Sequence, residues 1–85
     1  MSAKDWLGKW ALYSPEKVAL VEDDRKATYR ELNELAENYT SWLHKKKSIE
    51  KGDRVAILAS FSIELIALFA ASQKAGFVLV PINTR

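Results

Sequence analysis

Two short apolar runs near the end of the chain flank a segment with helical periodicity. Arg54–Ala59 follows a Gly52-Asp53 turn, Ser62–Ala75 repeats apolar residues at helical spacing, and Phe77–Val80 is closed by Pro81. This order predicts a parallel strand pair joined by a helical crossover. Both runs are apolar at nearly every position, which is typical of strands covered on both faces. The pattern therefore predicts more protein around this βαβ unit than the chain itself contains.

The helix expected over Ser62–Ala75 is apolar around more than one side, which is broader than the stripe of a surface helix. Either Ser60 or Ser62 can cap its start, and Gly76 stands where it should end. Lys74 falls on a face that is otherwise apolar. We therefore expect this helix to be covered on more than one side.

The start of the chain predicts a short amphipathic helix over Ser2–Tyr13. Ser2 is the expected cap, Asp5 its capping-box partner, and Pro15 ends the helix because the residue before a proline avoids the α region. We expect its aromatic face to dock on the rest of the fold, with stacking on a ligand as the alternative. That face comprises Trp6, Leu7, Trp10 and Tyr13.

A β-hairpin and a long helix follow. Val18–Glu22 and Lys26–Thr28 are the predicted strands, joined by Asp23-Asp24-Arg25. We interpret the acidic pair as a solvated turn rather than a metal or catalytic site. Thr28-Tyr-Arg-Glu31 is a capping box that opens a helix over about Tyr29–Lys46. The apolar stripe of this helix comprises Tyr29, Leu32, Leu35, Ala36, Tyr39, Trp42 and Leu43.

Basic residues gather where the long helix ends. We interpret Lys45-Lys46-Lys47 as charges that suit the helix terminus, with a phosphate or membrane patch as the alternative. His44 is the only histidine and is expected at the surface. Ser48–Gly52 is a polar connection with one apolar anchor, Ile49.

Composition narrows the function classes. The 85 residues make one domain at most, with 48% hydrophobic and 28% charged residues, as in ordinary globular proteins. Thirteen basic and eleven acidic residues are interspersed, so charge does not imply a nucleic-acid partner. The absence of cysteine excludes disulfides and thiolate catalysis and fits a cytoplasmic location. The most apolar segment, Ile63–Ala71, is far shorter than the roughly 20 residues of a membrane span.

The turn Ala59–Ser62 is where an α/β fold would hold a phosphate on a helix N-terminus. The glycines of such a site are absent, and neither a dinucleotide-binding nor a Walker sequence occurs. No Ser/His/Asp set, nucleophile elbow or paired acid/base carboxylates stand out, and no acidic set has metal-ligand spacing. We assign no catalytic, cofactor-binding or metal-ligating residue in this chain.

Five short pieces nevertheless stand in a recognisable order. They are Ser14–Val21, Ala27–Leu32, Lys51–Leu58, Gln73–Gly76 and Val80–Arg85. Together they resemble the start of the adenylate-forming enzymes, which include acyl-CoA synthetases, luciferases and the adenylation domains of nonribosomal peptide synthetases. The resemblance covers essentially the whole chain. It implies that residues 1–85 are a single, incomplete α/β segment of the large N-terminal AMP-binding domain of that fold.

The ending distinguishes groups within that superfamily. Pro81-Ile82-Asn83-Thr84-Arg85 is similar to the Pro-Leu-Asn-Thr-Arg of fatty-acyl, aryl and succinylbenzoate CoA ligases, whereas peptide-synthetase domains usually have Pro-Leu-Asp-Pro. The resemblance implies a parent acid–thiol ligase that uses ATP and Mg²⁺ to form an acyl-adenylate and then acylates coenzyme A. Phe61-Ser62 departs from the usual Asn-Ser of the family.

The family's phosphate loop, its adenine and ribose contacts and its lid lysine all belong to later sequence, so the chain alone is expected to be inactive. Its expected partner is the remainder of the parent enzyme. Two alternatives remain: a small self-associating α/β interaction module without enzyme activity, and the start of a peptide-synthetase adenylation domain.

Overall fold

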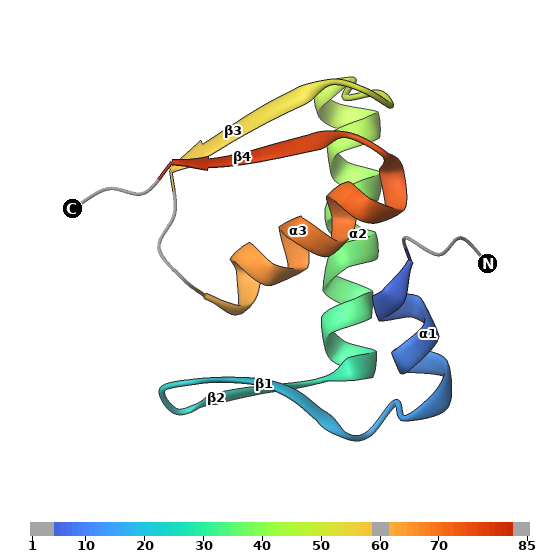
Figure 1. Cartoon of the computed structure of the whole chain (residues 1–85), viewed down its shortest axis with the longest axis vertical. Coiled ribbons are helices and arrows are strands. Elements are labelled where there is room, and N and C mark those ends of the chain that lie inside the picture. The colour runs from blue at the N-terminus through green and yellow to red at the C-terminus, as the bar shows by residue number, and fades with distance from the viewer. Residues whose placement is uncertain (1–4, 59–61, 83–85) are drawn as a thin grey trace.

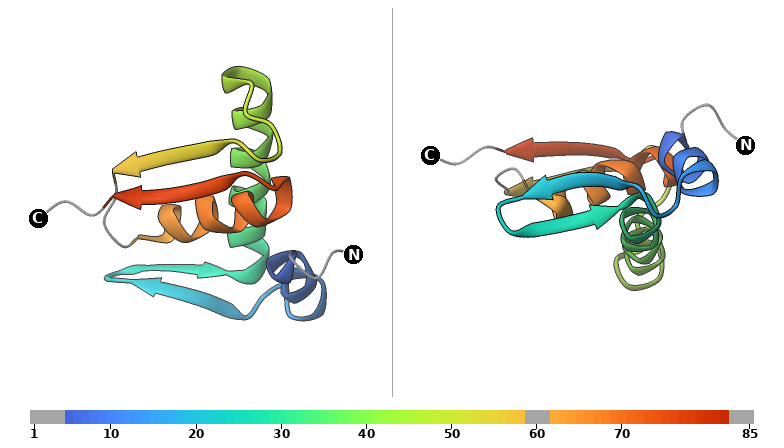
Figure 2. Two further views of the ribbon diagram at one scale, coloured as in Figure 1. Left: turned by 45° about the horizontal axis from the view of Figure 1, so that its top comes forward. Right: turned by 90° about the horizontal axis from the view of Figure 1, so that it is seen from below.

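The computed structural model describes residues 5–58 and 62–82, and seven elements in these ranges follow the predicted order. They are α1 (Trp6–Tyr13), β1 (Val18–Glu22), β2 (Arg25–Thr28), α2 (Tyr29–Lys47), β3 (Arg54–Leu58), α3 (Ile63–Ala75) and β4 (Val78–Ile82). The hairpin β1–β2 lies near one end of α2 and the pair β3–β4 near the other (Figure 1). Helix α3 lies between the two sheets and packs against α2 (Figure 2). This arrangement confirms the predicted α/β fold class.

Helix α1 begins later than the sequence pattern predicted. It starts at Trp6, and Asp5 is itself the N-cap, accepting a hydrogen bond from the Gly8 N–H at 3.0 Å. The predicted role of Asp5 as a capping-box partner is therefore wrong, because its carboxylate bonds the first turn directly. Ser2, the expected cap, lies outside the described residues.

The aromatic face of α1 docks only in part. Leu7 is fully buried, but Trp10 and Tyr13 are 45% and 69% exposed. The Trp10 ring stacks on Tyr29 of α2 with centroids 5.8 Å apart. The predicted docking on the rest of the fold is thus confirmed for Leu7 and Trp10, whereas Tyr13, the last residue of α1, stays exposed.

The hairpin and α2 form as predicted, with small shifts. Val18–Glu22 pairs antiparallel with a second strand that begins at Arg25, one residue earlier than expected. The Thr28 side chain accepts from the Glu31 N–H and the Glu31 carboxylate accepts from the Thr28 N–H, which confirms the capping box. Asp23 has a φ of 53° in the exposed turn, as short acidic residues tolerate.

The C-terminal βαβ unit is parallel, and Arg54 pairs with Val78 at its start. Ser62 caps α3, and Gly76 ends it in the left-handed region with a φ of 85°. Pro81 lies within β4 rather than after it, which corrects the predicted end of this strand. An edge strand tolerates proline because the missing N–H need not face a neighbour. Ala59, the predicted end of β3, lies outside the described residues.

Two apolar clusters form the core. The first joins α1, β2, α2 and α3, and its buried members are Leu7, Ala27, Leu32, Ala36, Ile63, Ala67 and Ala70. The second lies beneath the parallel pair and contains Leu43, Ala71 and Phe77. Alanines on α3 let it approach α2 closely, since a methyl group occupies little space between helices. Phe77 precedes β4 and is buried, so it anchors the parallel pair to the core instead of extending the strand.

One side of β4 has no cover within the described residues. Val78, Val80 and Ile82 are 48%, 42% and 46% exposed, and we call them the outer face of β4. Leu79, which points the other way, packs against the second cluster together with Val55 of β3. The strands are therefore covered on one face only, although their sequence is that of strands covered on both.

Candidate functional site

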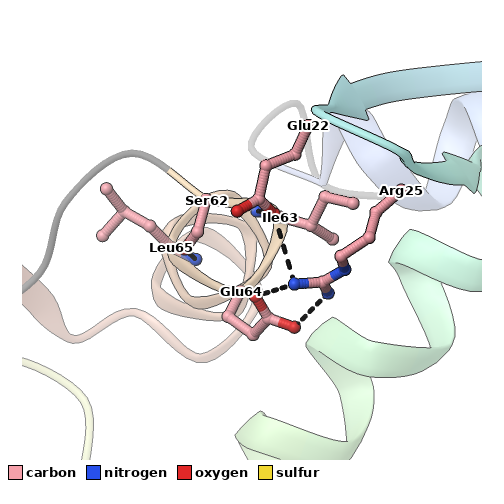
Figure 3. A network of polar contacts seen from close by, with 6 residues as sticks. All are labelled: Glu22, Arg25, Ser62, Ile63, Glu64 and Leu65. Carbon is pink, nitrogen blue, oxygen red and sulfur yellow. Dashed lines mark hydrogen bonds and ion pairs between the residues drawn. The ribbon is translucent and has the colours of Figure 1, made fainter.

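The N-terminus of α3 is the place where this fold type would hold a phosphate. Here the Ser62 hydroxyl accepts a hydrogen bond from the Leu65 N–H at 3.1 Å. The Ile63 N–H donates to Glu22 Oε1, also at 3.1 Å, so the end of the hairpin supplies a carboxylate to this helix end (Figure 3). Ser60 and Phe61 lie outside the described residues.

Arg25 joins the hairpin to the same helix end. Its guanidinium donates to both carboxylate oxygens of Glu64, with Nη1 3.1 Å from Oε1, and Nη1 lies 3.3 Å from Glu22 Oε1 (Figure 3). The hydrogen bond from Arg25 holds the pKa of Glu64 below its ordinary value, and Glu64 in turn raises the pKa of Arg25. We call Glu22, Arg25 and Glu64 the hairpin clamp.

The hairpin clamp determines what this helix end can bind. A carboxylate already accepts from the first backbone N–H, and a second carboxylate lies one residue further along. Both would repel an incoming phosphate, and the Arg25 guanidinium is already paired with them. The described residues at this position therefore do not fit the phosphates of a nucleotide, and their arrangement is suited to fastening the hairpin to α3.

A second polar cluster fastens α1 to the two long helices. Lys74 Nζ lies 2.8 Å from Asp5 Oδ1 and 3.5 Å from Glu37 Oε2, and the Lys74 side chain is only 9% exposed. Burial raises the pKa of Asp5, but hydrogen bonds from Lys74 and Gly8 outweigh burial and leave this pKa below its ordinary value. The cluster pairs a nearly buried ammonium group, which would be costly to leave alone.

A pocket of about 420 Å³ lies at the opposite end of α3, beside the C-terminal turn of α2. The surface of its lining is mostly apolar, and the lining comprises Thr40, Leu43, His44, Ile49, Glu50, Lys51, Ala75 and Phe77. Sequence reasoning identified Ile49 as an apolar anchor but did not predict the pocket. The lining comes from two stretches of sequence, 40–51 and 75–77, that the βαβ crossover brings together.

The other sequence candidates remain at the surface. His44, Asp23 and Asp24 are exposed, as predicted. Trp42 was placed in the apolar stripe of α2, but it is half-exposed and lies 5.3 Å from the Lys47 ammonium group. In the part of the chain that the structure describes, no group of three or more acidic or histidine side chains could hold a metal ion. No helix in the same ranges combines the length and apolar character needed to cross a membrane.

Neither polar cluster was predicted from the sequence. In the hairpin clamp, the hairpin residues lie about 40 positions from their partners on α3, and no local pattern links residues at such separations. Lys74 did carry a signal, because a lysine on an otherwise apolar helix face must find an acidic partner when that face is buried.

The chain matches known proteins over most of its length. The family model described as "AMP-binding enzyme" matches residues 7–85. The chain is 44% identical over 77 residues to the long-chain-fatty-acid–CoA ligase FadD13 of Mycobacterium tuberculosis, covering 88% of this chain and 15% of that protein. It is 41% identical over 73 residues to bacitracin synthase 1 of Bacillus licheniformis, covering 86% of this chain and 1% of that protein.

Solved structures agree with the fold. The N-terminal subdomain of NpsA from Klebsiella oxytoca superposes with a TM-score of 0.86 at 38% identity, covering 96% of this chain and 21% of that one. The chain thus spans a small part of the proteins that it matches. Its matched region includes every described element from Leu7 onward. The chain belongs to the AMP-binding, or adenylate-forming, enzyme family.

Proposed function

We propose that this chain is a structural part of the N-terminal domain of an ATP-dependent acyl-CoA synthetase and that it has no ligase activity alone. The parent reaction would convert a carboxylic acid, ATP and CoA into acyl-CoA, AMP and diphosphate. Forming an acyl-adenylate replaces a poor leaving group with a good one. The role of these 85 residues is to supply strands and helices on which a catalytic domain is built.

The outer face of β4 is the observation that carries this proposal. Three apolar side chains, Val78, Val80 and Ile82, alternate with the inward Leu79 and stay about half-exposed. Strands with apolar residues on both faces are typical of parallel sheets that are covered on both sides. The likeness to a fatty-acid–CoA ligase, of which this chain covers 15%, supports a larger enzyme as the source of that cover.

ATP, Mg²⁺ and CoA are the cofactors and substrates that we propose for the parent enzyme. The Glu22 carboxylate accepts from the first backbone N–H of α3, which supports placing the nucleotide site elsewhere in the parent enzyme. The groups that hold ATP and polarise its phosphates would therefore belong to other sequence, and no catalytic role is assigned to this chain. ATP and CoA are cytoplasmic metabolites, so we also propose a cytoplasmic location.

An activity measurement tests the proposal directly. The purified chain is incubated with ATP, Mg²⁺, CoA and a mixture of short-, medium- and long-chain carboxylic acids, and AMP and acyl-CoA are measured. We expect neither product above the level of a boiled control. CoA-dependent formation of both products by the chain alone would overturn the proposed structural role.

A peptide-synthetase adenylation domain is a second candidate, favoured by the 41% identity to bacitracin synthase 1. The two candidates differ in what accepts the acyl group, a carrier-protein thiol or CoA. Sequencing the ~100 codons that follow position 85 in the gene tests both, because the family's Ser/Thr/Gly-rich loop should occur there. A carrier-protein domain further downstream would favour the second candidate over the first.

A self-associating interaction module is the remaining alternative, and the exposed outer face of β4 is again its motive. Light scattering and an apolar dye distinguish it from a segment of a larger domain. A clean monomer that binds no dye would count against the segment. Dye binding together with open-ended association that grows with concentration would support a segment of a larger domain. A single closed dimer that binds no dye would support the interaction module.

A further inference from the structure

The pocket beside the C-terminal turn of α2 is formed by elements that hold each other in place. The Gly52 N–H donates to the Gly76 carbonyl at 2.9 Å, which joins the segment before β3 to the end of α3. The Ile49 N–H donates to the Leu43 carbonyl at 3.0 Å and folds the chain back over the helix end. These backbone bonds set the pocket walls without help from any ligand.

Lys51 has a defined place at the rim. Its side-chain stem lies against Gly76, where an added Cβ would meet Lys51 Cγ at 3.0 Å. A glycine at this position therefore leaves room for the lysine stem to cross the end of α3. The apolar stem covers the protein while the ammonium group remains in water, as is usual for lysine.

The charges near the pocket are mainly positive once the adjoining end of α2 is included. The lining contains one cation, Lys51, and one carboxylate, Glu50. The exposed run Lys45–Lys47 adds three cations on the adjoining helix end, of which Lys47 lies over Trp42. An apolar hollow beside a lysine-rich helix end is complementary to a ligand with an apolar body and an anionic head. The volume of about 420 Å³ lies within the roughly 300–1,000 Å³ range of small-ligand pockets.

We propose that this pocket binds a single-chain amphiphile with an anionic head, of the class of medium-chain fatty carboxylates. The alkyl chain lies against Leu43, Ile49 and Phe77, and the carboxylate is paired with Lys51. This site is independent of the function proposed above, which assigns no substrate contact to these residues. It can therefore fail or succeed without affecting the assignment of the parent reaction.

Titration of the ¹⁵N-labelled chain with octanoate, below the concentration at which it forms micelles, tests the site. We expect amide shifts that cluster around Leu43, Ile49–Lys51 and Ala75–Phe77, with half-saturation at roughly millimolar concentration. Affinity should rise about four-fold for each methylene group added to the acid, until the chain exceeds the pocket. Octanol and octylamine serve as neutral and cationic probes of equal length.

Two variants test the ligand's anionic head group and its alkyl tail separately. Lys51→Glu is expected to weaken octanoate binding roughly five-fold while leaving octanol binding unchanged. Lys26→Glu, the same charge change at an exposed site on β2, is the matched control and should leave both unchanged. Ala75→Leu is expected to weaken all three probes by filling the pocket, and far-UV circular dichroism checks that each variant folds.

Three results would overturn the proposal. They are the absence of shifts at millimolar octanoate, shifts centred on the outer face of β4 instead of the pocket, and equal affinity for the anionic and cationic probes. If Ala75→Leu does not fold, the comparison of Lys51→Glu with Lys26→Glu still decides the charge requirement. Equal octanoate affinity in those two variants would reject it.

Discussion

The two small sheets of this molecule differ in how they are held. The antiparallel hairpin β1–β2 joins neighbouring segments, and the hairpin clamp fastens its turn to α3 through Glu22, Arg25 and Glu64. The parallel pair β3–β4 joins distant segments and is held from beneath by Phe77 and Leu79. The hairpin is therefore fastened by polar groups at its turn in addition to the burial of Ala27 in the first cluster, whereas the parallel pair is held by apolar burial on a single face.

The two sheets differ in the kind of contact that stabilises them. Exposed ion pairs contribute little free energy, whereas burial of a large side chain contributes several times more. The parallel pair should thus depend strongly on its buried face and hardly at all on its open one. The hairpin should respond to salt more than the parallel pair does. Four predictions compare these polar and apolar contacts, including the Lys74 cluster between the helices, in order of decreasing expected effect.

Phe77→Ala should have the largest effect. Phe77 is 5% exposed and is the only aromatic member of the buried second cluster in the described residues, so its loss leaves a cavity beneath β3–β4. We expect unfolding free energy to fall by about 3 kcal/mol, measured by urea denaturation. Leu12→Ala, a truncation at a side chain exposed on α1, is the control and should change stability by less than about 0.5 kcal/mol. Equal losses in the two variants would show that the cluster does not support the parallel pair.

Lys74→Met should have the next largest effect and should depend on pH. Removing the ammonium group leaves Asp5 and Glu37 without their partner, at a cost of about 1 kcal/mol near pH 7. The folded-state pKa of Asp5 is lowered, so its contribution is fully present above about pH 4 and is lost as pH falls through the folded pKa. The difference between wild type and variant should therefore shrink on acidification.

Urea midpoints at about pH 7 and about pH 3 measure this change. Lys26→Met, which removes an exposed lysine from β2, is the matched control. A difference that grows on acidification would contradict the assignment of Asp5 as the partner.

Arg25→Gln should cost less than Lys74→Met, because the hairpin clamp is exposed. Its effect on the urea midpoint should decrease when NaCl is raised from about 0.05 M to about 0.5 M, since salt screens exposed charges. Arg30→Gln, which breaks the exposed pair with Glu16, is a control for ion pairs at the start of α2. A salt-independent loss larger than that of Lys74→Met would mean that the hairpin is held by more than surface charge.

Val80→Thr should have the smallest effect on stability. The side chain lies on the outer face of β4, and its replacement by another β-branched residue should change unfolding free energy by less than about 0.5 kcal/mol. Binding of an apolar dye should nevertheless decrease. Leu79→Thr, one residue away on the covered face, should instead destabilise the chain clearly. Similar stability losses at the two positions would show that both faces are buried in solution.

The accurate predictions from the sequence rest on local chemistry. Thr28 and Glu31 form their capping box within one helical turn, and Gly76 ends α3 because a left-handed residue is needed there. The parallel pairing followed from two apolar runs joined by a helical crossover. Asp5 was misassigned because an acidic residue suits both the N-cap and the capping-box position three residues later. Only the residue at which the helix begins decides between these two positions.

The candidate sites depended on distant contacts, and for that reason sequence patterns did not reveal them. Glu22 meets α3 only after the chain has crossed α2, and Lys51 reaches Gly76 only through the βαβ crossover. The outer face of β4, by contrast, was indicated by the sequence pattern. The apolar pattern predicted cover on both faces, and the described residues supply it on one.

The hydrogen bond between Glu22 and the Ile63 N–H also orders events during synthesis. The two residues are 41 positions apart, so at roughly 5–20 residues per second the hairpin leaves the ribosome about 2 to 8 seconds before its partner helix begins. During that interval Glu22 lacks the Ile63 N–H and Arg25 lacks the Glu64 carboxylate. The hairpin can therefore be fixed in its final position only after α3 has been synthesised.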